Sequence, residues 1–166
     1  LELIDTSHWL GLRDKALILF IYATGVRVSE AMSCKKEDID ENGWVRIGSG
    51  KGRERFVPVA DIALESLNEY LFKRTIDSDY LFINIKGGTL SRISAFNITK
   101  KYLNVSPQVL RHSFATSLIL GGADLRVVQE LLGHLSIATT QIYSSIQKEN
   151  IFDTVKKYHP LKDLDD

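Results

Sequence analysis

The chain has 166 residues, 44% of them hydrophobic and 25% charged, an ordinary composition for one globular domain with a substantial core. The charges of its 21 basic and 21 acidic residues cancel, so net charge does not point to a nucleic-acid partner. The longest apolar run, residues 16–23, is too short to cross a bilayer, and no secretory signal precedes it. One cysteine cannot form an internal disulfide. We therefore expect a cytoplasmic protein with no membrane partner.

The first third of the chain predicts two helices and a small sheet. Helical spacing of apolar residues indicates a buried helix over about residues 11–24, which Gly25 ends, and a short second helix over 28–33. Between residues 38 and 59, β-prone segments surround an Asn-Gly pair and a glycine-rich turn. This pattern predicts an antiparallel sheet of two or three strands.

The middle of the chain predicts helices separated by a short extended piece. Asp61 is expected to cap a helix with one apolar stripe made of Leu64, Leu67 and Leu71. Residues 80–82 are predicted to be extended, and a further helix is expected to start at Ser91 or Ser94 and to run to about Tyr102.

The last third predicts four more helices. Ser106 and Pro107 start a helix that buries Leu110, Phe114 and Leu118 and stops at two glycines. Asp124 caps the next, which ends at Gly133 and turns three residues inward: Leu125, Val128 and Leu132. Ser136 is expected to cap a helix bearing Tyr143. A final helix over about 148–158 has an apolar stripe, which either folds back on its own core or docks on a neighbouring protomer. The fold class is therefore α+β, mainly helical, with a small antiparallel sheet at one edge.

Five side chains suit the attack of a tyrosine on a phosphodiester: Arg27, Lys51, Arg111, His134 and Tyr143. The nonbridging oxygens need cationic donors in the transition state, and the planar fork of arginine supplies two hydrogen bonds without losing its charge. A lysine in a turn can protonate the leaving oxygen, and a histidine at a helix end can add a donor. Too few carboxylates or thiols accompany these residues for a metal site.

Four of these residues also have an ordinary structural interpretation. Arg27 can pair with Glu30 one helical turn later, and Lys51 can be a solvated turn lysine. His134 can cap a helix end, and Tyr143 can be a half-buried aromatic. Their joint occurrence in this order and spacing favours the catalytic interpretation.

Five boxes resemble the active-site boxes of the tyrosine recombinases, the phage integrase family: GVRVSE (25–30), GKGR (50–53), LRHSFAT (110–116), LLGH (131–134) and TTQIY (139–143). The run 121–143 is especially similar to the bacterial Xer recombinases, and the resemblance extends from about residue 13 to 159. It implies a tyrosine-recombinase catalytic-domain fold. It also implies strand cleavage through a 3′-phosphotyrosine with release of a 5′ hydroxyl. This cleavage needs no metal or nucleotide cofactor, because the covalent link to the tyrosine conserves the energy of the phosphodiester bond.

The resemblance assigns catalytic roles to six residues: Arg27, Lys51, Gln108, Arg111, His134 and Tyr143, the last as nucleophile. Glu30 is expected to support the site. Basic residues in two clusters are expected to contact DNA: Arg53, Arg55, Lys100 and Lys101. The implied partners are double-stranded DNA with an inverted-repeat site and further recombinase protomers, the same or related, in a DNA-bound tetramer.

Three departures from the family pattern matter. Gln108 stands where the family usually has a histidine, and its amide can donate hydrogen bonds but cannot act as a general base. The stretch between Lys101 and Ser106 is shorter than usual. The N-terminal core-binding domain of Xer-type enzymes is absent, so residues 1–166 are expected to form a C-terminal catalytic domain.

The leading hypothesis is a site-specific DNA recombinase, for chromosome-dimer resolution or for integration and excision of a mobile element. A type IB topoisomerase shares the tyrosine and arginines, but the similarity of residues 121–143 to Xer recombinases argues against a topoisomerase. The alternative from another class is a catalytically weak or silent DNA-binding module of the same fold, which Gln108 motivates.

Overall fold

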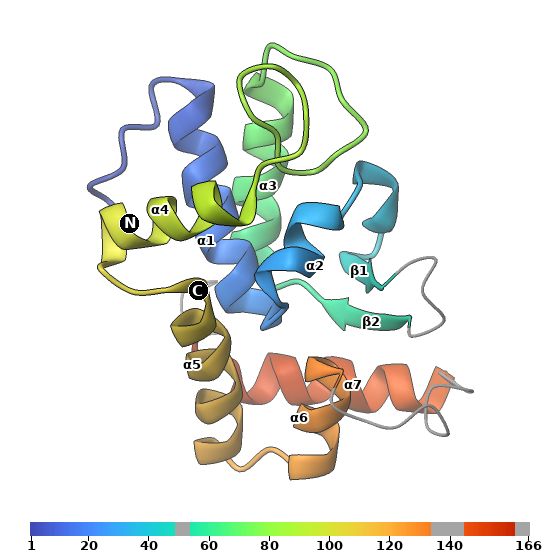
Figure 1. The fold of residues 1–166 in the computed structure, drawn as a ribbon. Helices are drawn as coiled ribbons and strands as arrows, with labels where there is room; N and C mark the ends of the chain where they lie inside the picture. The colour runs from blue at the N-terminus through green and yellow to red at the C-terminus, as the bar shows by residue number, and fades with distance from the viewer. Residues whose placement is uncertain (49–53, 134–144, 162–166) are drawn as a thin grey trace.

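The computed structural model describes residues 1–48, 54–133 and 145–161, without the side chains of 145–150. The elements within these ranges are α1 (Trp9–Thr24), α2 (Val28–Ser33), η1 (Lys36–Asp38), β1 (Trp44–Ile47), β2 (Arg55–Pro58), α3 (Asp61–Lys73), α4 (Arg92–Leu103), α5 (Pro107–Leu120), α6 (Leu125–Leu132) and α7 (Ser145–Tyr158). Figure 1 shows α1 between α3 and α5, with the two strands at one edge. The predicted mainly helical α+β class is confirmed.

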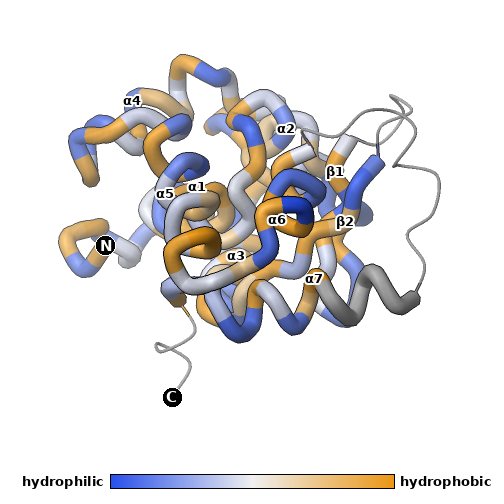
Figure 2. Tube along the Cα trace, turned by 90° about the horizontal axis from the view of Figure 1, so that it is seen from below, coloured by the Kyte–Doolittle hydropathy of each residue, from blue (hydrophilic) through white to orange (hydrophobic). Residues whose placement is uncertain are grey.

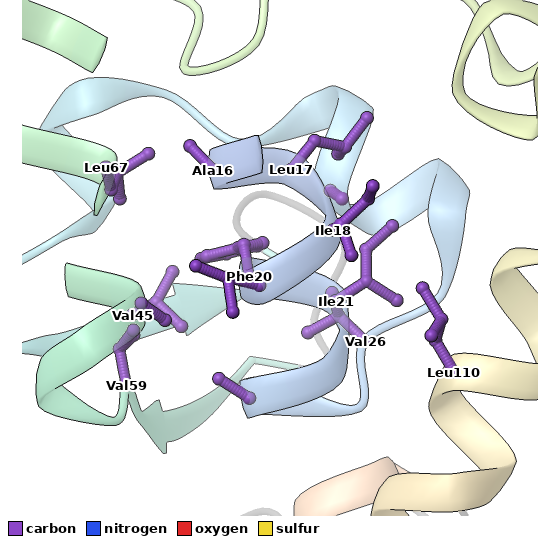
Figure 3. Close-up of a cluster of buried hydrophobic side chains, with 14 of the residues drawn as sticks. Ala16, Leu17, Ile18, Phe20, Ile21, Val26, Val45, Val59, Leu67 and Leu110 are labelled. Carbon is purple, nitrogen blue, oxygen red and sulfur yellow. The ribbon is translucent and has the colours of Figure 1, made fainter. Parts of the chain in front are cut away.

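Helix α1 is the centre of the core because it is apolar on nearly every side, as buried helices are. Figure 3 shows its side chains between those of the sheet region, α3 and α5. Phe20 and Ile21 are completely buried, and α1 contacts α3, α4 and α5. The helix ends at Gly25, as predicted, and the Gly25 N–H donates to the carbonyl of Ile21 at 2.8 Å.

The two strands pair antiparallel, with Val45 opposite Val57 and Ile47 opposite Arg55. Alternate residues of each strand face the core, as the period of two requires, and Val45 and Val57 are fully buried. The predicted small sheet is confirmed, and it has two strands within the described residues. Its pairing places Arg55 on the same buried face as Val57.

Helices α3 and α4 begin close to their predicted positions. Asp61 is the first residue of α3 and not its cap, which is Ala60. The predicted stripe was only partly right: Leu67 is fully buried, but Leu64 and Leu71 are half-buried and the remaining buried positions are Ala63, Ser66 and Tyr70. Tyr70 extends the buried side of the helix beyond the predicted leucines, because its ring stacks on those of Phe82 and Trp9.

Helices α5 and α6 form the lower part of the molecule in Figure 1. Leu110, Phe114 and Leu118 are buried on α5 as predicted. Asp124 caps α6 by accepting from the N–H of Arg126 at 2.7 Å, and Gly133 ends the helix in the left-handed conformation. The expectation for Leu125 was wrong, because it is 56% exposed. As the first residue of a short helix, it lies beyond the edge that packs on α5.

In this single chain, helix α7 folds back on its own domain, an arrangement that both alternatives allow in the absence of DNA. It contacts α5, α6 and β2, and Ile151 and Val155 are 1% and 4% exposed. The helix begins three residues earlier than expected.

Figure 2 shows apolar and polar colours alternating along α5 and α6, as amphipathic helices require. None of the helices in the described part of the chain combines the length and apolarity that a bilayer crossing needs.

Candidate functional site

Four of the predicted site residues lie outside the described residues: Lys51, Arg53, His134 and Tyr143. The others lie on α2, β2, α4 and α5. The site can therefore be built from the two predicted phosphate-binding arginines, Arg27 and Arg111, and from what surrounds them.

Arg27 is placed by a sharp corner between α1 and α2. Gly25 adopts φ +65°, and a Cβ atom there would lie 2.2 Å from Cδ1 of Phe114, so only glycine fits. The chain then turns directly into α2, with Arg27 as the residue before its first turn. The Arg27 side chain is 48% exposed, which leaves its guanidinium accessible to a ligand.

Arg111 reaches the same corner from α5. Its Nη1 donates to the carbonyl of Gly25 at 2.7 Å, and its Nη2 donates to the carbonyl of Leu132 at 3.0 Å. Burial is the main reason that the pKa of the Arg111 guanidinium falls to about 10, and the charge of Arg27 lowers it further. The side chain therefore stays cationic at neutral pH while it joins the α1–α2 corner to the end of α6.

Glu30 lies at the centre of the cluster. Its Oε1 accepts from the backbone N–H of Arg27 at 2.8 Å. The guanidinium of Arg27 and that of Arg111 each lie 3.9 Å from its carboxylate. Burial raises the pKa of Glu30, but the hydrogen bonds and charge of Arg55 outweigh this effect and keep it below its ordinary value. One carboxylate thus holds two arginines near each other although they are 84 positions apart in the sequence.

Arg55 was expected to contact DNA, and the structure corrects this expectation. Only 5% of the residue is exposed. Its Nη1 and Nη2 bind the two carboxylate oxygens of Glu30 at 2.6 and 2.9 Å, and its Nε donates to the carbonyl of Leu131 at 2.8 Å. The physical reason is the strand period, which puts Arg55 on the face that Val57 also uses.

The C-terminal end of α6 is held by both buried arginines. Arg55 takes the carbonyl of Leu131 and Arg111 takes that of Leu132. A Cβ on Gly133, which has φ +73°, would lie 2.7 Å from Nη1 of Arg55. Cations are favoured at this end of a helix because its last carbonyls are unpaired and carry the negative end of the dipole. His134 follows directly in the sequence.

The remaining predicted residues lie on helix surfaces. Gln108 is exposed in the first turn of α5, three residues before Arg111, and so on the same side of the helix. Lys100 and Lys101 are exposed in the last turn of α4, and the Lys101 ammonium lies 4.9 Å from the Tyr102 ring centroid. Exposure leaves all three accessible to a large ligand.

Three arginines around one carboxylate leave an excess of positive charge at this corner. Such a cluster suits an anion that carries several oxygens, above all a phosphate. Among the described residues, no group of three or more His, Cys, Asp or Glu side chains could hold a metal ion. Arg111, which two backbone carbonyls hold in place, is a donor fixed in advance, and such donors stabilise negative charge without reorganising.

The model of the phage integrase family matches residues 1–150. The chain belongs to the phage integrase family. The tyrosine recombinase XerD of Chlorobaculum tepidum is 43% identical to this family member over 90% of the chain and 54% of the relative. The crystal structure of XerA recombinase has a TM-score of 0.67 and 32% identity over 90% of this chain and 57% of that one.

A second solved structure, XerH site-specific recombinase bound to its difH substrate in a pre-cleavage complex, has a TM-score of 0.71 and 34% identity. The match covers 89% of this chain and 47% of that one. This integrase-family chain thus spans about half the length of the proteins to which it is similar.

Proposed function

We propose that this chain is the catalytic domain of a Xer-like site-specific DNA recombinase. The observation that carries the proposal is the convergence of Arg27 and Arg111 on Glu30, each at 3.9 Å. Two guanidiniums beside one another match the nonbridging oxygens of a phosphodiester. The XerH relative, which is similar in fold and sequence, is bound to a difH DNA substrate.

In the proposed reaction, the phenol oxygen of Tyr143 attacks the scissile phosphorus and forms a 3′-phosphotyrosine, and the phenol proton passes to solvent water. The bond to the 5′ oxygen breaks, and Lys51 protonates this leaving group. Arg27, Arg111 and His134 donate hydrogen bonds to the nonbridging oxygens, where charge builds in the transition state. Attack by a 5′ hydroxyl of another strand reverses these steps and rejoins the DNA.

The proposed substrate is double-stranded DNA with an inverted-repeat site, on which protomers assemble as a tetramer. An inverted repeat presents the same half-site to two protomers related by a twofold axis. Lys100 and Lys101 are the exposed cations proposed to contact the DNA backbone. We place the domain in a longer protein with an N-terminal DNA-binding domain and the reaction in the cytoplasm, the compartment that holds the DNA.

The test is a suicide DNA substrate that traps the covalent intermediate. The full-length protein should form an adduct visible on a denaturing gel, and Tyr143→Phe should abolish it while a band shift on the intact site persists. Tyr80→Phe, a change of a surface tyrosine on another part of the chain, is the matched control. A wild-type band shift without an adduct would instead identify a silent DNA-binding module.

A further inference from the structure

Arg55 is a buried cation that the proposed reaction does not use. It begins β2 and is 5% exposed, and buried arginines of this kind are rare unless they are paired. All three guanidinium nitrogens have a partner: two bind the carboxylate of Glu30 and Nε binds the carbonyl of Leu131. The side chain therefore joins the sheet to two segments that carry the candidate site.

The effect of Arg55 on Glu30 follows from the geometry of the fork. A guanidinium that binds both oxygens of a carboxylate fixes its plane as well as its position. The close contacts, 2.6 and 2.9 Å, belong to Arg55, whereas Arg27 and Arg111 remain at 3.9 Å from the same carboxylate. Without Arg55, the half-buried carboxylate of Glu30 would pair with one of these two arginines instead.

The effect of Arg55 on α6 concerns the residues just before His134. Its Nε holds the Leu131 carbonyl at 2.8 Å, and a Cβ on Gly133 would meet its guanidinium at 2.7 Å. The end of α6 is therefore packed directly against the Arg55–Glu30 pair. A shift of this pair would move both the arginine corner and the end of α6.

We propose that Arg55 is a positioning residue, which occupies the Glu30 carboxylate so that Arg27 and Arg111 are directed to the phosphate. It acts through Glu30 and the end of α6 and touches no reacting atom. The inference rests on the proposed function, because it assigns a role within the same reaction.

The experiment measures DNA binding and cleavage separately in the full-length protein with Arg55→Lys and Arg55→Gln. A small displacement of catalytic groups can cost about 10²-fold in rate, so we expect a loss of this order in the single-turnover rate of adduct formation. The dissociation constant for a half-site should stay close to that of the wild type. Arg46→Gln is the matched control, since Arg46 is an arginine of the same hairpin that binds a different carboxylate, Asp38, at 3.0 Å.

A pH profile separates positioning from simple destabilisation. In Arg55→Gln, the pKa of Glu30 should rise because burial is then opposed by Arg27 but no longer by Arg55, and protonation at low pH would end the competition of Glu30 for Arg27 and Arg111. The cleavage rate of this variant should therefore recover as the pH is lowered toward 5, relative to the wild type. The double variant Glu30→Gln/Arg55→Gln should show no such recovery and should cleave faster than Arg55→Gln at pH 7.5.

The outcomes distinguish the inference from the proposed function. A wild-type protein that forms no adduct would refute the proposed function. If the wild type cleaves and both Arg55 variants cleave at the same rate, the positioning role is refuted. Loss of the folded state in both Arg55→Lys and Arg55→Gln, seen by circular dichroism, would assign Arg55 to fold stability and also overturn it.

Discussion

At the scale of single residues, the three arginines around Glu30 differ in how far their side chains are exposed to solvent. The Arg55 side chain is 6% exposed, that of Arg111 13% and that of Arg27 48%. Arg55 binds the Glu30 carboxylate, and Arg55 and Arg111 together bind three backbone carbonyls, one at the α1–α2 corner and two at the end of α6. Arg27 is therefore the member of the cluster best able to follow an incoming phosphate.

The first prediction concerns Arg27. Arg27→Ala should lower the single-turnover cleavage rate by on the order of 10²–10³, as expected for loss of one donor to a developing negative charge. Arg27→Lys should recover part of this loss, because it restores the charge but not the fork. Lys73→Ala, on the surface of α3, serves as the control. A wild-type rate for Arg27→Ala would show that Arg27 only pairs with Glu30.

The second prediction concerns Gln108, which is exposed on the side of α5 that also carries Arg111. Gln108→His should be tolerated and should raise the cleavage rate near neutral pH, because an imidazole with an ordinary pKa of about 6.5 can accept a proton and an amide cannot. Adduct formation at several pH values measures the effect. A large loss of activity would mean that the site is built around glutamine.

At the scale of elements, glycines at helix ends set the directions of the chain that bring the site together. Gly25 turns α1 into α2 and offers its carbonyl to Arg111. Gly133 ends α6 against Arg55. Both glycines have positive φ, and each lies against another side chain, the Phe114 ring or the Arg55 guanidinium. A larger residue would therefore be strained in its backbone and would also clash with that side chain.

The third prediction tests the Gly25 corner. Gly25→Ala should destabilise the chain by about 2 kcal/mol or more, since alanine is strained at positive φ and its Cβ would overlap the Phe114 ring. Urea unfolding measures the change. Gly88→Ala is the control, because its Cβ would meet only Asn84 at an ordinary 3.4 Å. Equal stability of the two variants would contradict this account of the corner.

At the scale of the whole molecule, the C-terminal segment closes the fold. Helix α7 packs on α5, α6 and β2, and His159 follows it into a buried position, 1% exposed. Its ring lies 5.4 Å from that of Phe114 and 6.0 Å from that of Tyr22, measured between centroids. Nδ1 of His159 accepts from the N–H of Leu161 at 3.0 Å. His159 thus attaches the segment after α7 to α1 and α5.

The fourth prediction follows from the burial of His159, which lowers its pKa to about 4. Below its ordinary pKa of about 6.5 the unfolded chain binds a proton that the folded chain does not take up. The contribution to stability is therefore complete above pH 6.5 and is lost as the pH falls toward 4, by on the order of 3 kcal/mol.

The measurement is urea unfolding between pH 7 and 4.5 for the wild type and for His159→Gln, which keeps an acceptor but does not titrate. The wild type should lose more stability over this interval than the variant. His8→Gln, a change of an exposed histidine at the start of α1, should follow the wild type. Parallel curves for wild type and His159→Gln would contradict the prediction.

The sequence by itself determined the order of the elements, most of their ends and the family. Gly25, Asp124 and Gly133 mark helix ends because capping and left-handed turns depend on a few neighbouring residues. The strand alternation and the apolar spacing of α5 are local in the same sense. The candidate residues came from the order of the boxes, and the structure places two of them, Arg27 and Arg111, beside one carboxylate.

The tertiary structure alone decided which charged and apolar side chains are buried. Arg55 looked like a surface cation, yet its partners lie 25 and 76 positions away in the sequence. Leu125 is exposed although it fits an apolar stripe, and α7 packs on α5, α6 and β2 of its own chain. No local pattern encodes these outcomes, because burial depends on the contacts that distant segments make once the chain has folded.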